Sequence, residues 1–277
     1  MVTRPQLDVG TGPEPRIEHE RTRLANLFRH ARVVVLASLL GVILSAWAYL
    51  LAGAGMDMRA MGGMLMPMAS QDWTLGHFTL MLAMWAVMML AMMLPSAAPM
   101  ILFYDKITSN RGNANQRTGS TSFFGLGYMV VWAAFSVAAV VLQYGLDRAK
   151  LLSPMMETHS VALAGTLFIF AGLYQLTPLK QTCLRHCRSP IEFIITEWRG
   201  GRRGAFAMGL LHGVYCLGCC WVLMLLLFVG GLMNFYWVAG IAVYVLLEKT
   251  APVGHWLSRL IGVGLVAWGG VTLFSLT

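Results

Sequence analysis

The sequence HGVYCLGCCW occupies positions 212–221, inside an apolar run that extends from about position 204 to position 231. Successive residues of an α-helix are rotated by about 100°, so His212, Cys216, Cys219 and Cys220 share one face over about 12 Å of helix axis. The apolar run is long enough to cross a bilayer. Because polar side chains at membrane depth are costly and usually functional, this stretch predicts a membrane helix with one face of sulfur and imidazole donors.

The composition agrees with a membrane protein. Hydrophobic residues make up 57% of the 277 residues and charged residues only 12%, and the mean hydropathy is +0.66. These values lie outside the usual range of soluble globular domains. All five cysteines fall in two short clusters, each with a histidine, which favours metal ligation or redox chemistry over a secreted disulfide framework.

We expect an all-α membrane protein, a polytopic bundle of about seven transmembrane helices. The apolar runs cover residues 33–52, 77–104, 121–144, 159–179, 204–231, 235–247 and 256–277, and together they form one transmembrane domain, 33–277. Residues 1–32 are polar and rich in arginine, and we interpret them as a disordered, basic cytoplasmic tail. The first apolar run begins too deep in the chain for a signal peptide, so we expect an uncleaved anchor.

The distribution of lysine and arginine predicts the orientation. With the N-terminus in the cytoplasm, the basic residues of the tail and of the inner loops all lie inside, and only Arg59, Arg148 and Lys150 lie outside. This imbalance favours a cytoplasmic N-terminus and an external C-terminus, in a bacterial inner membrane crossed several times. It also accounts for the net charge of +8 without a nucleic-acid partner.

The sulfur and imidazole face favours a metal ion. Cysteine and histidine suit Cu(I), Zn(II) or an iron centre, and methionine favours Cu(I), so Met208 on the same face makes copper the first choice. The alternative is that the cysteines only pack as small apolar residues between helices. Cys216 and Cys219 also form a C-x-x-C pair, which leaves a redox function open.

A second cluster follows the fourth apolar run. Cys183, His186 and Cys187 have i, i+3 and i+4 spacing, so on a helix they would converge on one ion. The alternative is a basic juxtamembrane helix whose thiols are incidental. Because the fifth helix rises roughly 11 to 22 Å from its inner end to its ligands, we expect two separate sites unless the intervening loop folds back into the bundle.

Methionines and two further histidines are candidate accessory ligands. Six methionines gather in the first outer loop: Met56, Met58, Met61, Met64, Met66 and Met68. Thioethers hold copper where thiols would oxidise. Met88 and Met92 belong to a methionine stripe on the second helix, for which flexible core packing is the competing interpretation. His77 and His159 begin the second and fourth helices on the outer side, where an ordinary interfacial position is the alternative.

Three blocks of the chain resemble a known family. They are LAMWAVMMLAMMLPS at 82–96, YQLTPLKQTCLRHC at 174–187 and HGVYCLGCCWVLM at 212–224. In this order they resemble the signature of predicted metal-binding integral membrane proteins of bacteria, domain of unknown function 2182. The resemblance covers about residues 73–249 and implies a membrane fold and metal binding, with a connection to copper in the inner membrane.

We therefore expect a soft-metal binding protein of the membrane, with copper as Cu(I) the first choice and zinc or iron as alternatives. It would transfer the ion across the bilayer or deliver it to a membrane protein or enzyme. No nucleotide-binding motif and no catalytic residues are apparent. Two alternatives remain: a membrane thiol-disulfide oxidoreductase that uses Cys216/Cys219 and Cys183/Cys187, and an assembly subunit of a membrane enzyme.

Overall fold

A computed structural model describes residues 33, 35–54, 58–61, 64–67, 73–109, 114–153 and 156–275. The predicted tail, 1–32, lies outside the described residues, as do Met56 and Met68 of the first outer loop. The rest of that loop contributes a two-stranded antiparallel hairpin, β1 (Met58–Met61) and β2 (Met64–Pro67).

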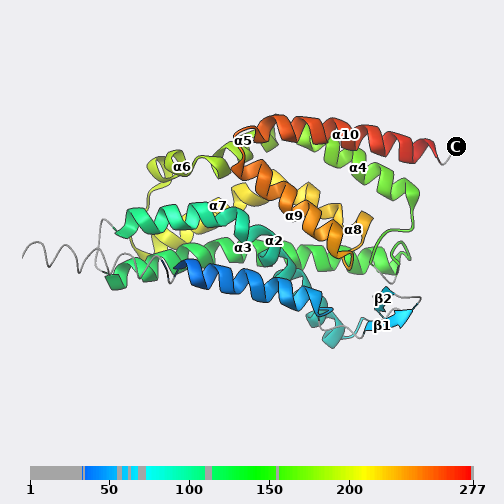
Figure 1. The fold of residues 1–277 in the computed structure, drawn as a ribbon, viewed down its shortest axis with the longest axis horizontal. Helices are drawn as coiled ribbons and strands as arrows, with labels where there is room; N and C mark the ends of the chain where they lie inside the picture. The colour runs from blue at the N-terminus through cyan, green and yellow to red at the C-terminus, as the bar shows by residue number, and fades with distance from the viewer. Residues whose placement is uncertain are drawn as a thin grey trace, which may run out of the picture.

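Apart from this hairpin, the described elements are helices, as the apolar runs predict (Figure 1). The first is the short apolar helix Val35–Leu51. The others are α2 (Leu75–Ser109), α3 (Ala114–Arg148), α4 (Val161–Leu176), α5 (Pro178–Arg188), α6 (Pro190–Glu197), α7 (Gly201–Leu225), α8 (Leu227–Gly230), α9 (Phe235–Thr250) and α10 (Gly254–Phe274). The predicted fold class, an all-helical bundle, is confirmed at this level.

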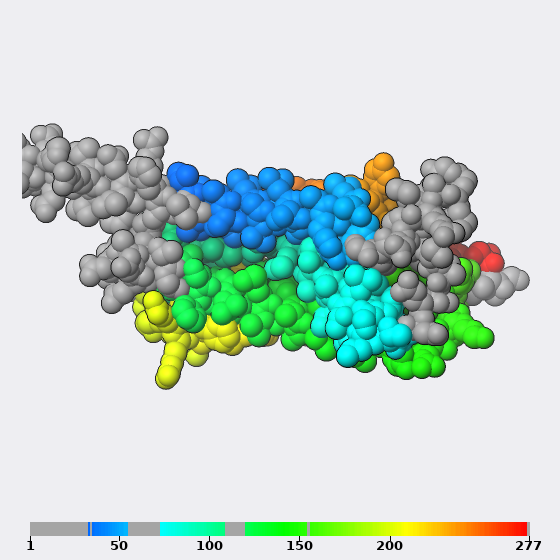
Figure 2. Space-filling model, turned by 90° about the horizontal axis from the view of Figure 1, so that it is seen from below, coloured from blue at the N-terminus to red at the C-terminus, as the bar shows by residue number. Residues whose placement is uncertain are grey.

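The helices form an elongated bundle with two outer layers. Helices α3 and α7 pack together at its centre, with α2 against α3, α5 against α7 and α9 against α2. Helices α4 and α10 pair along one side (Figure 1). The helix Val35–Leu51 lies lengthwise along the opposite side, over α2 and α3 (Figure 2), where Trp47 meets Phe235 edge-on at 5.4 Å.

Four helices are long and apolar enough to cross a membrane. They are Leu75–Thr108, Ser120–Arg148, Gly201–Gly230 and Gly254–Phe274, and the bent pair α4 and α5 makes a fifth if it counts as one span. Val35–Leu51 and α9 are shorter, although they occupy the predicted first and sixth apolar runs. The structure thus supports four to five membrane-crossing helices by length and composition.

The predicted fourth span, 159–179, is broken. Helix α4 ends at Leu176, and α5 starts at Pro178 with its axis turned by 64°. Proline disfavours a helical conformation in the residue before it, and Thr177 is extended, with φ −70° and ψ 146°. The Thr177 hydroxyl then accepts a hydrogen bond from the Lys180 amide and caps α5. The chain therefore turns back into the bundle at this point.

Glycines allow α3 and α7 to approach closely. A Cβ on Gly209 of α7 would overlap the backbone oxygen of Phe124, and a Cβ on Gly127 of α3 would overlap that of Phe206. Small residues at such contacts are typical of tightly packed membrane helices. Because α7 carries three of the cysteines, this packing also sets the position of the site.

Substitution of Gly209 by alanine is expected to lower the melting temperature of the detergent-solubilised protein, because α3 and α7 must separate to make room for the methyl group. Gly125→Ala on α3 is the matched control, since nothing lies within 4 Å of its added Cβ. For Gly125→Ala we expect the free energy of unfolding to rise by up to about 1 kcal/mol, because alanine has a higher helix propensity than glycine. Equal melting temperatures for the two variants would contradict the close approach of α3 and α7.

Candidate metal site

Four thiols meet in the centre of the bundle, where α5 packs against α7. Cys216, Cys219 and Cys220 of α7 are buried, with exposed fractions of 0–1%. Cys187, at the end of α5, lies within interaction distance of both Cys216 and Cys219. Cys220 lies beside the same two thiols, and its thiol donates to the backbone oxygen of Cys216. The two clusters that we expected to form separate sites therefore lie next to each other, because α5 folds back along α7.

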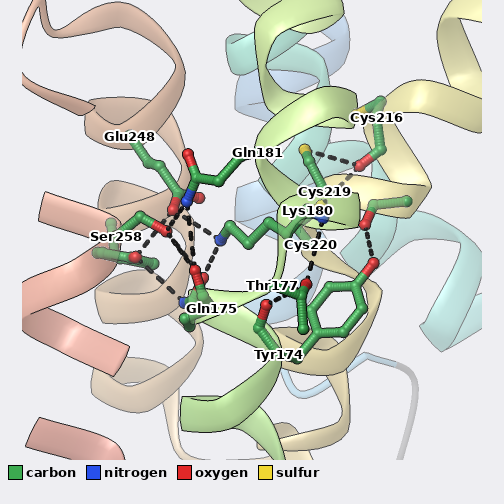
Figure 3. A network of polar contacts seen from close by, with 12 residues as sticks. Tyr174, Gln175, Thr177, Lys180, Gln181, Cys216, Cys219, Cys220, Glu248 and Ser258 are labelled. Atoms are coloured by element: carbon green, nitrogen blue, oxygen red, sulfur yellow. Dashed lines mark hydrogen bonds and ion pairs between the residues drawn. The ribbon is translucent and has the colours of Figure 1, made fainter. Parts of the chain in front are cut away.

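The thiols also bond to the helix backbone. Cys219 and Cys220 donate to the backbone oxygen of Cys216 at 3.1 and 3.0 Å (Figure 3). Among the described residues, no three His, Cys, Asp or Glu side chains are already arranged as a metal site. To share an ion, these cysteines must therefore give up these backbone hydrogen bonds and adopt other χ1 rotamers.

Cys216 has two further partners that the sequence analysis did not identify. The Lys249 ammonium of α9 donates to its sulfur at 2.9 Å, and the Tyr128 hydroxyl of α3 lies 3.1 Å from the same sulfur. Lys249 also donates to Ser96 at 3.3 Å. A buried cation is expensive unless it is paired. Lys249 thus places a positive charge beside the sulfur that would carry negative charge as a metal ligand.

A thioether completes the sulfur surroundings. Met93 of α2 lies with its sulfur 3.8 Å from that of Cys220. The accessory candidates Met88 and Met92 are buried at 1% exposure within the same methionine-rich helix. Met208 lies elsewhere, since its sulfur accepts a hydrogen bond from the backbone amide of Arg199 at 3.3 Å. The methionine next to the cysteines is therefore Met93.

His212 lies one turn before Cys216 and is surrounded by aromatic rings. Its ring centroid is 6.0, 5.8 and 5.5 Å from those of Phe124, Tyr128 and Phe193. The side chain is 3% exposed, and its Nδ1 is buried without a hydrogen-bond partner. An unpaired buried nitrogen is costly, which makes Nδ1 available for a ligand.

The second cluster separates on α5. Cys183 faces α7, where its sulfur would be 2.8 Å from a Cβ added to Gly218. His186 stacks on Tyr215 at 4.4 Å, and its Nδ1 lies 2.9 Å from the backbone oxygen of Thr182. Of Cys183, His186 and Cys187, only Cys187 thus joins the thiols of Cys216 and Cys219. The other two line the same helix contact at its edge.

The two outer histidines are far from equivalent. His159 is exposed at the start of α4. His77 is half-buried, meets Trp73 edge-on at 5.0 Å, and has a buried Nδ1 without a hydrogen-bond partner. Neither histidine is a partner of the cysteines in the part of the chain that the structure describes.

A buried polar network holds α5 in place. The Lys180 ammonium forms an ion pair with Glu248 of α9 at 2.6 Å, with both side chains fully buried, and also donates to Gln175. The Tyr244 hydroxyl donates to Glu248 at 3.0 Å. In Figure 3 Lys180 points towards Gln175 and Glu248, while Cys216 and Cys219 lie on the other side of the view. The network thus anchors the helix that carries Cys187.

From the sequence alone, Lys180 belongs to the basic inner loop after the fourth apolar run, and Glu248 and Lys249 form an interfacial pair at the inner end of the sixth run. The structure corrects this: Lys180, Glu248 and Lys249 are 0%, 0% and 7% exposed, and the neighbours Glu248 and Lys249 have different partners. The burial of Glu248 and Lys249 could have been predicted from the length of the sixth apolar run. This run, 235–247, spans only about 20 Å as a helix. A bilayer core is about 30 Å thick, so residues directly after this run lie at depth.

The sequence matches a family described as PpoB2, copper chaperone, over residues 82–272. The chain belongs to this copper chaperone family. The match covers α3 to α9, most of α2 and most of α10, and so it includes every cysteine discussed above. It confirms the copper connection that the resemblance implied, under a different family description from the domain of unknown function. No curated protein and no solved structure matched the chain.

Proposed function

We propose that this protein holds Cu(I) as cargo inside a membrane bundle and passes it across the membrane or to a membrane partner. The observation that carries this proposal is the packing of α5 against α7, which places Cys187 beside Cys216 and Cys219 and gathers soft donors from two segments of the chain. Thiolates are strong ligands for Cu(I). The copper chaperone family supports copper as the ion, ahead of zinc or iron.

The charge balance of the site fits a monovalent ion. Cu(I) bound by two thiolates carries one negative charge, and the Lys249 ammonium, 2.9 Å from the sulfur of Cys216, offsets it. A neutral assembly is far less costly than an isolated charge in a membrane interior. Zn(II) would need more ligands, because structural zinc sites are almost always four-coordinate.

We further propose that all seven apolar segments are embedded in the bacterial inner membrane, with a cytoplasmic N-terminus and an external C-terminus. This topology is supported by the distribution of basic residues. The Val35–Leu51 helix starts at one end of the bundle and α10 ends at the other (Figure 1), which also supports this topology. The alternatives, a thiol oxidoreductase and an assembly subunit without bound metal, gain no support from the family.

Replacement of Cys187 by alanine tests whether α5 supplies a ligand. We expect the Cu(I) affinity to fall by at least about 10-fold, because even residues that only orient metal ligands cost about 10–100-fold when they are changed. The measurement is competition with a chromophoric Cu(I) chelator under anaerobic conditions, with total copper and zinc determined on the same samples. X-ray absorption at the copper edge then counts the bound sulfurs.

Cys183→Ala is the matched control, since Cys183 lies one turn earlier on α5 and packs against Gly218. It removes one thiol from the same helix, and we expect it to change the Cu(I) affinity by less than about 3-fold. Equal losses in the two variants would show that α5 does not present Cys187 specifically. No copper binding by the unaltered chain would overturn the proposed function.

A further inference from the structure

A second group of soft donors lies around Gln143 near the end of α3. Gln143 is 2% exposed, and its oxygen accepts a hydrogen bond from the Trp85 indole at 2.7 Å. Its amide nitrogen lies 3.5 Å from the sulfur of Met81 and 3.3 Å from the sulfur of Met156. Gln143 is fifteen positions beyond Tyr128, the neighbour of Cys216, so this group lies about 22 Å further along α3.

These contacts are unusual for a buried amide. A thioether is a weak hydrogen-bond acceptor, so the donors of Gln143 are paired with poor partners. Met81 comes from α2 and is 0% exposed, whereas Met156 comes from the segment between α3 and α4 and has φ +57°. One amide nitrogen therefore holds together two sulfurs from separate parts of the chain, and a soft cation would be a stronger partner for both.

His77, on the same helix as Met81, has a nitrogen that could act as a third donor. It lies four residues before Met81 on α2, so the two side chains share a face one turn apart. At the same level Trp73 donates to Asp147 of α3 at 2.7 Å, and Asp147 is itself four residues after Gln143. The contact between α2 and α3 thus continues from Gln143 to the level of His77, whose Nδ1 is buried and has no hydrogen-bond partner.

We propose that Met81, Met156 and His77 form a second Cu(I) site, which holds the cargo ion before or after it occupies the cysteines. This inference rests on the proposed function for the identity of the ion. Two thioethers and an imidazole are neutral, soft or borderline donors, which favours Cu(I) over divalent ions that prefer oxygen. In the proposed topology the site lies at the outer end of the bundle.

Buried methionines connect this site to the cysteines. Met84, Met88 and Met92 follow Met81 on α2 and are each 1% exposed, and Met93 then contacts Cys220. From Met81 to Met93 the helix rises about 18 Å. The α2 stripe thus links the two sites, and thioethers along it can bind Cu(I) without forming the disulfides to which thiols are prone.

The test is the number of Cu(I) ions bound by the full-length protein in detergent, measured by anaerobic titration against a chromophoric chelator. Unaltered protein is expected to bind two ions. The variant Met81→Leu/Met156→Leu is expected to bind one, because leucine preserves the packing volume but removes both sulfurs. Met100→Leu is the matched control, since it removes a buried sulfur of α2 that lies about 28 Å further along the helix, beyond Met93, and this variant is expected to bind two.

The variant Cys216→Ser/Cys219→Ser separates this inference from the proposed function. It is expected to keep one ion, which the further change of Met81 and Met156 to leucine removes. If the unaltered protein binds a single ion that only the cysteine variant loses, the second site is wrong and the proposed function stands. If the methionine variant alone loses copper, the second site stands and the cysteine site is wrong. Two ions in the methionine variant would overturn the second site.

Discussion

Serine at both Cys216 and Cys219 is expected to lower the Cu(I) affinity of the central site by more than about 100-fold. Loss of residues that only orient metal ligands already costs about 10–100-fold, and here two ligands change together. A serine hydroxyl is a hard donor with little affinity for Cu(I). Two of the four grouped thiols, Cys187 and Cys220, remain beside the altered positions, so the number of thiol donors is halved.

The double variant should still fold. Serine is close to cysteine in size, and its oxygen can accept the hydrogen bond that Lys249 donates to Cys216. The measurement is chelator competition for Cu(I), together with the melting temperature of the metal-free protein. Cys183→Ser serves as the control for a change of one thiol at the edge of the group. An unchanged affinity in the double variant, with full folding, would exclude these cysteines as ligands.

Replacement of Lys180 by methionine is expected to lower the free energy of unfolding by about 3–5 kcal/mol, the usual cost of removing one partner from a buried ion pair. The reason is the carboxylate that remains. Glu248 is 0% exposed, one of its oxygens pairs with Lys180 at 2.6 Å, and the other has no hydrogen-bond partner. Without the ammonium, Glu248 stays buried with only the hydroxyl of Tyr244 as a partner.

The double variant Lys180→Met/Glu248→Gln is the control. It removes both charges, and we expect it to recover most of the lost stability, since a buried pair is often replaced by uncharged groups at little cost. Denaturant unfolding in detergent, followed by tryptophan fluorescence, measures both variants. A single variant as stable as the unaltered protein would show that the ion pair does not anchor α5.

The same pair of variants reports on the metal site. Lys180 and Cys187 lie two turns apart on α5, so a loosened α5 should displace Cys187 from Cys216 and Cys219. We expect weaker Cu(I) binding in Lys180→Met and recovery in the double variant. Unchanged copper binding in a clearly destabilised single variant would mean that the position of Cys187 does not depend on this anchor.

Several features of the site were predicted from local sequence. The face shared by His212, Cys216, Cys219 and Cys220 follows from the 3.6-residue period of the helix and needs no knowledge of other helices. The burial of these residues follows from the apolar run around them. The methionine stripe of α2 was also predicted from the helical period. The period alone does not reveal that Met93 is the methionine beside Cys220.

The partners from other elements were not predictable in this way. Tyr128, Gln143 and Lys249 have no local pattern that sets them apart from their neighbours. Each acquires its role only when α2, α3, α7 and α9 are packed together. Likewise, His186 has the correct spacing to join Cys187, but its stacking on Tyr215 directs it elsewhere.

The sequence by itself determined the helical membrane class and the cysteine face of α7, because hydropathy and helical period are local properties. The break at Thr177 and Pro178 also has a local cause, because proline restricts the residue before it, but the apolar run 159–179 was predicted as one continuous span. Only the tertiary structure decided that the chain then turns inward and brings Cys187 to Cys216. That direction depends on an ion pair between Lys180 and Glu248, which are far apart in the chain, and on the packing of α5 against α7.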